Sequence, residues 1–295
     1  KRYETSYNPH LALQKLWKNQ IFQFSYSQGF NAPTASSSFI SGLNVSNDSL
    51  LPEHATQFEL SAQGLLFNTH FDYQVSIFHL NVRDKLTQLS GVDPLNSSTY
   101  TYFANTGVQQ NRGIEASLGY VWFIKKNPVL ARIEPFVSSS FYDFTYTDFT
   151  TKVGGKLTDF SGKQVVGVPR QKFAVGLDLA SPQGFYMNNT FTYMGDVYAD
   201  FANTNKVGSF TQYNAKIGYR QSFRFARFAP KNFDLDVFVA GNNLSNQINY
   251  TFLFLGSSIN DADKGNGYPA GVATDLNPGP SKAYFFGGFG LKYHF

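Results

Sequence analysis

The last residues of the chain read Tyr284-Phe285-Phe286-Gly287-Gly288-Phe289-Gly290-Leu291-Lys292-Tyr293-His294-Phe295. Within this stretch Phe289, Leu291, Tyr293 and Phe295 stand at alternate positions, with glycine, lysine and histidine between them. Successive side chains of a β-strand point to opposite faces of its sheet. The stretch therefore predicts a strand with one apolar face and one polar face.

The same alternation recurs along the whole chain. Phe22, Phe24 and Tyr26, for example, alternate with Gln23 and Ser25. Many of the segments are longer than the roughly 5 or 6 residues usual for strands of globular proteins. About eleven such strands are predicted, over 10–17, 20–29, 53–66, 69–89, 99–123, 129–147, 168–180, 184–197, 209–223, 231–246 and 282–295.

The connections between these segments differ in length in a regular way. Short turns alternate with long, polar connections rich in glycine and serine. Transmembrane β-barrels sort their connections in this manner, with short turns on one side of the membrane and long loops on the other, whereas a soluble β-sandwich has no reason to do so. The long connections are expected at about 30–52, 90–98, 148–167, 198–208 and 247–281.

Composition favours the same fold class. Only 15% of residues are charged, against about 25% in soluble domains, while the chain has 31 Phe and 18 Tyr. Polar residues interrupt every apolar run before it reaches the roughly 18 residues of a transmembrane helix. We therefore predict an all-β protein, a transmembrane antiparallel up-and-down β-barrel. The Glu and Arg residues on its second face imply a water-filled or plugged interior.

Other classes of function receive little support from the sequence. The net charge of +4 comes from scattered Lys and Arg residues, and nucleic-acid binding needs a clustered basic face. The chain has no cysteine, and its five histidines lie on different predicted strands or loop ends. Catalytic and metal sites need converging side chains. We therefore expect no enzyme activity, no catalytic residues, no metal site and no cofactor.

Four stretches resemble, in order, the barrel signatures of TonB-dependent receptors. Their order, their spacing and the terminal Phe295 together carry the resemblance. The stretches are Tyr26-Ser27-Gln28-Gly29-Phe30-Asn31-Ala32-Pro33-Thr34, Leu51-Pro52-Glu53 with Phe58-Glu59-Leu60, Asn105-Thr106-Gly107 with Arg112-Gly113-Ile114-Glu115, and Asn242-Asn243-Leu244-Ser245-Asn246.

The resemblance implies a barrel of about 22 strands that is closed by a plug domain, in the outer membrane of a Gram-negative bacterium. About eleven strands cannot close alone, because single-chain bacterial barrels have an even number of strands. Residues 1–295 are thus expected to be the C-terminal half of the barrel, without the plug or the first half. Either the residues before Lys1 are not captured, which we favour, or the receptor is split between two polypeptides.

The function that the resemblance implies is active transport. Such a receptor binds an extracellular siderophore, vitamin, glycan or peptide and imports it with energy from TonB. The alternative is a passive porin-like channel or the barrel component of an outer-membrane complex. The expected partners are the TonB complex through the plug, the remaining half of the barrel, outer-membrane lipid, the barrel-assembly machinery and a surface lipoprotein.

Candidate site residues fall into three groups. Ligand contacts are expected from aromatic loop residues and one lumen cation, namely Phe30, Phe39, Tyr100, Tyr102, Arg112, Tyr250, Phe252 and Tyr268. The residues Glu115, Lys216, Arg220 and Lys292 are expected to face the lumen together with Arg112. Membrane anchoring and an assembly signal are expected from Phe289, Leu291, Tyr293 and Phe295, the last at the periplasmic rim.

Overall fold

The structure is a computed structural model, and it describes residues 6–40, 43–93, 95–96, 98–153, 156–224, 232–248, 250–255, 273–278 and 282–293. Within these residues the regular secondary structure consists of strands. No helix in the described part of the chain is long and apolar enough to cross a membrane.

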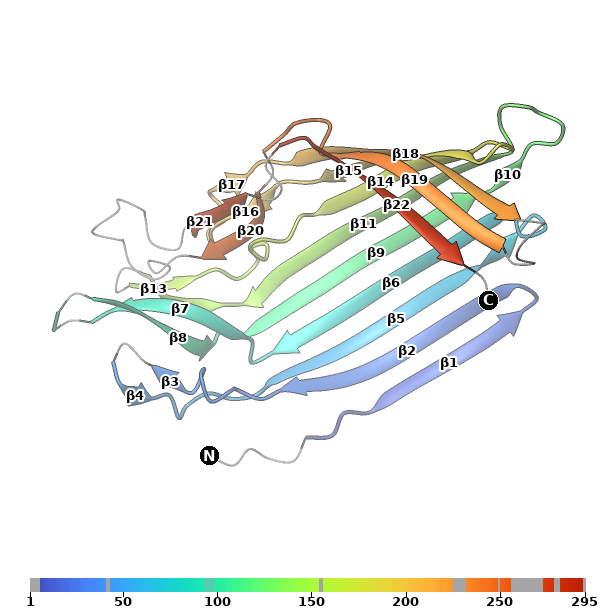
Figure 1. The fold of residues 1–295 in the computed structure, drawn as a ribbon. Helices are drawn as coiled ribbons and strands as arrows, with labels where there is room; N and C mark the ends of the chain where they lie inside the picture. The colour runs from blue at the N-terminus through green and yellow to red at the C-terminus, as the bar shows by residue number, and fades with distance from the viewer. Residues whose placement is uncertain are drawn as a thin grey trace.

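Eleven strands pair antiparallel, each with the next in order, to form one large sheet that we call the wall (Figure 1). The eleven predicted segments all contribute, so the meander order is confirmed. The short β10 (Trp122–Phe123) pairs beside β11. The wall consists of β1 (His10–Trp17), β2 (Gln20–Asn31), β5 (Glu53–Leu66), β6 (Phe71–Arg83), β9 (Val108–Tyr120), β11 (Arg132–Asp148), β14 (Gln171–Ala180), β15 (Phe185–Met194), β18 (Phe210–Arg224), β19 (Asn232–Asn242) and β22 (Tyr284–Tyr293).

Five small hairpins project from one end of the wall, which we call the long-loop end, and tight turns join the strands at the short-turn end (Figure 1). The long connections thus contain strands that their Gly- and Ser-rich composition did not predict. The hairpins are β3 (Phe39–Ile40) with β4 (Val45–Ser46), β7 (Leu86–Val92) with β8 (Thr99–Asn105), β12 (Thr150–Val153) with β13 (Lys156–Asp159), β16 (Val197–Tyr198) with β17 (Lys206–Val207), and β20 (Tyr250–Leu255) with β21 (Ala273–Pro278).

Two predicted segments, 69–89 and 99–123, were wrongly taken as continuous strands. The wall strand β6 ends at Arg83, and Asp84 follows with a φ of 53°. On the partner side, Gly107 has a φ of 98° and separates β8 from β9. Residues with positive φ leave the extended conformation of a strand, so the pairing of β6 with β9 ends at these positions. Residues beyond them form the separate hairpin β7–β8.

The wall has an apolar face, defined by a row of large side chains that are paired across six strands. The neighbour of Ile77 on the other face, Ser76, is only 8% exposed, whereas Ile77 is 51% exposed. Exposure of a whole row of large apolar side chains is unusual in water and normal in lipid. The row is Leu13, Phe24, Leu60, Ile77, Ile114 and Phe141.

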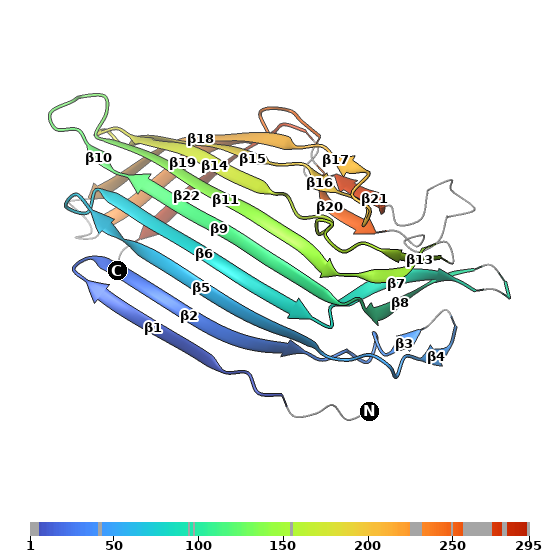
Figure 2. The same cartoon turned by 180° about the vertical axis from the view of Figure 1, so that it is seen from behind.

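The wall curls into a trough, and β19 and β22 cross in front of the middle strands in Figure 1 and behind them in Figure 2. The polar face is the inner one, where Tyr186 of β15 and Asp236 of β19 reach each other across β18 at 2.7 Å. Ser76 and Glu115 are paired on this face. Several of its glycines lie under aromatic rings of the next strand. A Cβ added to Gly176 would stand 2.0 Å from the ring of Phe136. Because glycine has no side chain, these positions leave room for the neighbouring rings.

The two outer strands of the wall each have one neighbour. Among the described residues, β1 pairs with β2 alone and β22 pairs with β19 alone. The described strands therefore form an open wall, and residues 10–17 do not pair with the last strand, as predicted. An unpaired strand edge in lipid leaves backbone N–H and C=O groups without partners, which is costly.

A small hydrophobic core joins several connections at the long-loop end. Phe149 and Phe201 are 0% and 1% exposed, and their ring centroids lie 4.7 Å apart. Burial raises the pKa of Tyr146 to about 12, so its phenol stays protonated at neutral pH. We call this group the loop-end core, and it consists of Leu89, Tyr146, Phe149, Phe160 and Phe201.

The loop-end core should fix the hairpin β12–β13 to the top of the wall. Phe149→Ala removes a fully buried ring, which typically costs about 3–5 kcal/mol. We expect proteases to cleave residues 149–160 much faster in membrane vesicles that contain the protein, while the wall stays folded. Leu157→Ala, on the same hairpin but 66% exposed, serves as the control and should cleave like the wild type. Equal cleavage of both variants would show that the core does not hold the hairpin.

Candidate functional site

Three rings form a cluster on the polar face, in the half of the wall nearer the long-loop end. Tyr142 lies 5.0 Å from Phe144 and 6.2 Å from Phe78, as measured between ring centroids. The rings cover Gly113, where a Cβ would stand 2.5 Å from Phe78. The hydroxyl of Tyr142 donates a 2.6 Å hydrogen bond to Glu115. This inner aromatic cluster offers rigid ring faces in a polar surrounding, which suits planar or amphipathic ligands.

A second group on the polar face is charged and lies nearer the short-turn end. The Lys216 ammonium stands 3.9 Å from the ring centroid of Phe238 and 5.4 Å from that of Tyr186. Arg220 donates to Asp236 at 2.8 Å, and the Tyr186 hydroxyl donates to the same carboxylate at 2.7 Å. A cavity of about 390 Å³ opens beside Lys216 and Arg220. Hydrogen bonds and ring contacts hold these charged side chains in place, so they can bind a polar partner inside the trough.

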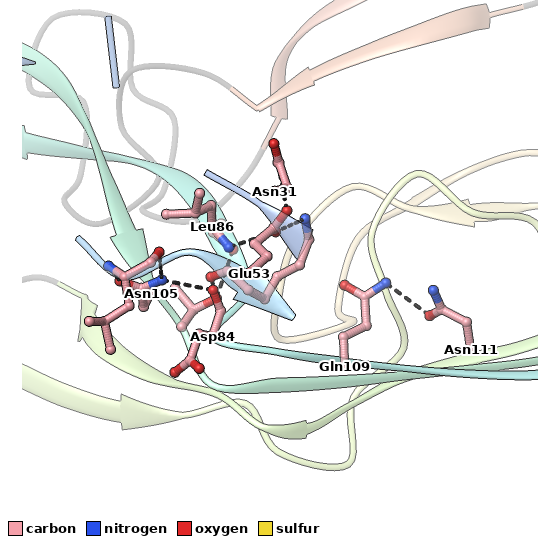
Figure 3. A network of polar contacts seen from close by, with 11 residues as sticks. Asn31, Glu53, Asp84, Leu86, Asn105, Gln109 and Asn111 are labelled. Atoms are coloured by element: carbon pink, nitrogen blue, oxygen red, sulfur yellow. Dashed lines mark hydrogen bonds and ion pairs between the residues drawn. The ribbon is translucent and has the colours of Figure 1, made fainter. Parts of the chain in front are cut away.

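The Leu-Pro-Glu motif places Glu53 at the start of β5, where the carboxylate connects three strands (Figure 3). Glu53 is 9% exposed and accepts hydrogen bonds from Lys85 at 2.6 Å, the Leu86 amide at 2.8 Å and Asn31 at 2.9 Å. Burial alone would raise the pKa of Glu53, but these hydrogen bonds outweigh it and hold the pKa below its ordinary value of 4.5.

The Asn-Thr-Gly motif works beside it, at the end of β8 (Figure 3). The Asn105 amide donates to the carbonyls of Leu51 and Asp84 at 2.9 and 2.7 Å and accepts from the Leu51 amide at 2.8 Å. A Cβ on Gly107 would stand 2.1 Å from the Asp148 carbonyl oxygen. Asn105 thus ties three chain segments together, and only glycine fits at position 107.

The Asn-Asn-Leu-Ser-Asn motif ends β19 in the same manner. Asn243 is fully buried with a φ of 49°. Its amide N–H donates to the Asn214 side chain at 2.9 Å, and its own side chain donates to the Gln247 carbonyl at 2.8 Å. The motifs that carry the family resemblance therefore hold the places where strands leave the wall. Sequence reasoning did not assign them this role, because their partners lie far away in the chain.

The predicted aromatic ligand residues whose side chains the structure describes lie in two places. Phe30 lies on the apolar face, paired with His54. Phe39, 46% exposed, lies on the hairpin β3–β4, which contacts β8 through a 2.7 Å hydrogen bond from Asn47 to the Phe103 carbonyl. On β8 itself, Tyr102 packs against the loop-end core, and the ring of Tyr100 lies tilted beside that of Tyr102, with 5.9 Å between the ring centroids.

The prediction that Arg112 faces the lumen is wrong. Arg112 pairs with His79 and Asp143, two positions from Ile77 and Phe141, and therefore lies on the apolar face. Residues three apart in a strand point to opposite sides, so Arg112 and Glu115 cannot share a face. The other four predicted lumen residues lie on the polar face, as expected: Glu115, Lys216, Arg220 and Lys292.

Three of the four predicted anchor residues lie on the apolar face of β22. Phe289 and Leu291 are 76% and 62% exposed, and the ring of Tyr293 lies tilted against that of Phe233, with 4.8 Å between the ring centroids. Other predicted residues cannot be placed in this way. Tyr268 and Phe295 lie outside the described residues, and for Tyr250 and Phe252 only the backbone, in strand β20, is described.

The described part of the chain contains no group of three or more His, Asp or Glu side chains that could hold a metal ion. The features that it does contain are an exposed apolar face, a polar trough and connections of unequal length on its two ends. Together they define the class of the protein as an outer-membrane β-barrel.

Comparison with known proteins identifies the family. A family model described as TonB dependent receptor-like, beta-barrel matches residues 1–244, and the chain belongs to this family. The family consists of transporters, not enzymes, in the outer membrane of Gram-negative bacteria, so the chain is part of an outer-membrane protein of this family.

The individual proteins that the chain resembles have low sequence identity to it. The chain is 26% identical over 230 residues to a probable TonB-dependent siderophore receptor, PiuA of Acinetobacter baumannii, covering 75% of this chain and 27% of the relative. The crystal structure of PiuA aligns with a TM-score of 0.62 at 19% identity, over 97% of this chain and 36% of PiuA. The ferric citrate transporter FecA aligns with a TM-score of 0.63 at 15% identity, over 97% and 38%. The chain thus spans well under half the length of these relatives.

The Glu53 network should weaken in acid. A carboxylate with a lowered pKa stabilises the folded state above its ordinary pKa, and this stabilisation is lost as the pH falls from about 4.5 through the lowered value. We expect hydrogen exchange at residues 84–87, corrected for the intrinsic rate, to accelerate over that range. Glu53→Gln should abolish this acid-dependent step, and Glu53→Ala should cost about 1–3 kcal/mol of local stability at neutral pH.

Glu59→Gln is the matched control, because Glu59 lies on the same face of β5 outside this network. It should keep the acid-dependent step of the wild type. If Glu53→Gln also keeps that step, another group causes it and the assignment to Glu53 fails.

Proposed function

We propose that this chain is part of the wall of an outer-membrane receptor that binds an iron–siderophore complex and imports it with energy from TonB. The observation that carries the proposal is the family match over residues 1–244, combined with the resemblance to a probable siderophore receptor. The family supports the transport mechanism, and the relative supports the class of ligand.

The inner aromatic cluster supports a ligand of this kind. Phe78, Tyr142 and Phe144 present ring faces beside the Glu115 carboxylate, on the side of the wall that faces the barrel interior. Siderophore complexes are bulky and carry both apolar and polar groups. Rigid rings with one or two polar neighbours bind such molecules with little loss of side-chain entropy.

The rest of the receptor is part of the proposal. The open edges of the wall at β1 and β22 favour completion of the barrel by further strands, about 22 in total. The polar trough, with its charged group around Lys216 and Arg220, suits contact with a plug domain. TonB would act through that plug. We also propose that Phe289, Leu291, Tyr293 and Phe295 anchor the last strand in lipid and form the signal that the barrel-assembly machinery reads.

Deletion of the gene tests the proposal most directly. Iron-limited cells should lose uptake of one ⁵⁵Fe-labelled complex from a panel of purified siderophores, and expression of the complete receptor should restore it. Deletion of tonB should abolish that uptake as well. Uptake that persists without TonB would favour the passive channel instead, and loss of growth on a vitamin, glycan or peptide alone would replace the substrate class.

The inner aromatic cluster can be tested within the same assay. Truncating a ring that contacts a ligand typically costs 1 to 2 kcal/mol, so Tyr142→Ala and Phe144→Ala should weaken binding of the transported complex by about tenfold. Phe191→Ala, a ring of similar size on the apolar face of β15, should bind like the wild type. Unchanged binding by both cluster variants would remove the cluster from the proposed site without touching the transport function.

A further inference from the structure

On three neighbouring strands, the apolar face turns polar at positions that are paired with one another. The next residue on this face after Ile77 is His79, towards the long-loop end of β6. The pairing carries this step across to β9 and β11. The last apolar row is Ile77, Ile114 and Phe141, and the first polar row is His79, Arg112 and Asp143.

The step marks the outer boundary of the membrane. On β11, the apolar face carries Ile133, Pro135, Val137, Ser139 and Phe141 before Asp143 begins the polar part. The segment 133–141 matches the roughly 9–11 residues with which a tilted strand crosses the hydrocarbon core. The first polar row therefore lies where lipid headgroups meet the protein.

A groove of about 890 Å³ lies across this boundary. Residues 78, 113 and 142 line the groove between the two rows. Phe78 and Tyr142 point to the polar face, and Gly113 has no side chain. The last apolar row lines one side of the groove, and the first polar row lines the other side. The groove is therefore amphipathic and opens towards the membrane.

Arg112 is the cation in this groove that is best placed to bind an anion. The side chain is exposed, and its guanidinium donates a 2.8 Å hydrogen bond to Gln110, the next residue on the same face towards the long-loop end. The charge thus points away from the apolar row. Among the ion pairs found in the described residues, none involves Arg112.

The other charges around the groove leave it a net cationic character. Asp143 is paired with Arg112 in the sheet, and Arg170 adds a second positive charge to the lining. Asp196, also in the lining, is neutralised by Lys206 at 2.5 Å. Counting Lys206, the groove has three positive charges (Arg112, Arg170 and Lys206) and two carboxylates (Asp143 and Asp196).

We propose that this groove binds a phosphorylated lipid of the outer leaflet. Its acyl chains would lie on Ile77, Ile114 and Phe141, and its phosphate would accept hydrogen bonds from Arg112. A planar guanidinium suits a phosphate better than other side chains do, and the attraction is strong at a membrane surface. The inference rests on the outer-membrane location of the family and is independent of the substrate that the receptor imports.

Native mass spectrometry of the complete receptor in detergent tests the proposal, with bis-phosphorylated lipid A as the probe. The wild type should bind this lipid more tightly than dephosphorylated lipid A. Arg112→Ala and Arg112→Gln should each bind it about tenfold more weakly, because they lose a charge-assisted contact. Ile114→Ser should also weaken lipid binding, because it removes an apolar side chain from the side of the groove that contacts the acyl chains. Heat-modifiable migration in gels shows that each variant is folded.

Lys15→Ala is the matched control, because Lys15 is a cation on the apolar face of β1, outside the groove, where it pairs with Phe22. It should bind like the wild type. The proposal is overturned if Arg112→Ala and Lys15→Ala behave alike, or if dephosphorylated lipid A binds equally well. It is also overturned if inorganic phosphate alone occupies the site as tightly as the lipid, which would make this a free-phosphate site.

Discussion

The register of the antiparallel strands is the constraint on which the whole molecule depends. Because side chains alternate, a slip by one residue would turn the apolar row through Ile77 and Ile114 into the trough and the serines and carboxylates into lipid. The hydrogen bonds of Glu53, Asn105 and Asn243 fix the chain where strands leave the wall. Three of the motifs on which the family resemblance rests thus hold the chain at the ends of strands.

As a result, the two faces of the wall carry different groups of side chains. The apolar face changes from apolar to polar side chains at the row that contains Arg112. The polar face carries the inner aromatic cluster nearer the loops and the charged group of Lys216 nearer the turns. Beyond the wall, the loop-end core packs several connections against one another.

The sequence predicted the strands well, because alternation is a local property of each segment. It did not predict the hairpins in the long connections, since two-residue strands such as Phe39–Ile40 carry no periodicity. The network of Glu53 was also missed, because Asn31 and Lys85 lie 22 and 32 residues away from it. The error at Arg112 was avoidable: its distance of three residues from Glu115 already excludes a common face. Where the loop aromatics point depends on tertiary packing, which no local pattern encodes.

The central claim is that the wall stands in lipid with the face of Ile77 outwards. The chain contains no cysteine, so single cysteines can report on neighbouring positions. Ile77→Cys and Ser76→Cys, spin-labelled in the complete receptor in membranes, should differ sharply: the label at 77 should be relaxed by oxygen dissolved in lipid, and the label at 76 by a water-soluble nickel complex. The reverse pattern, or access from water at both positions, would contradict the account.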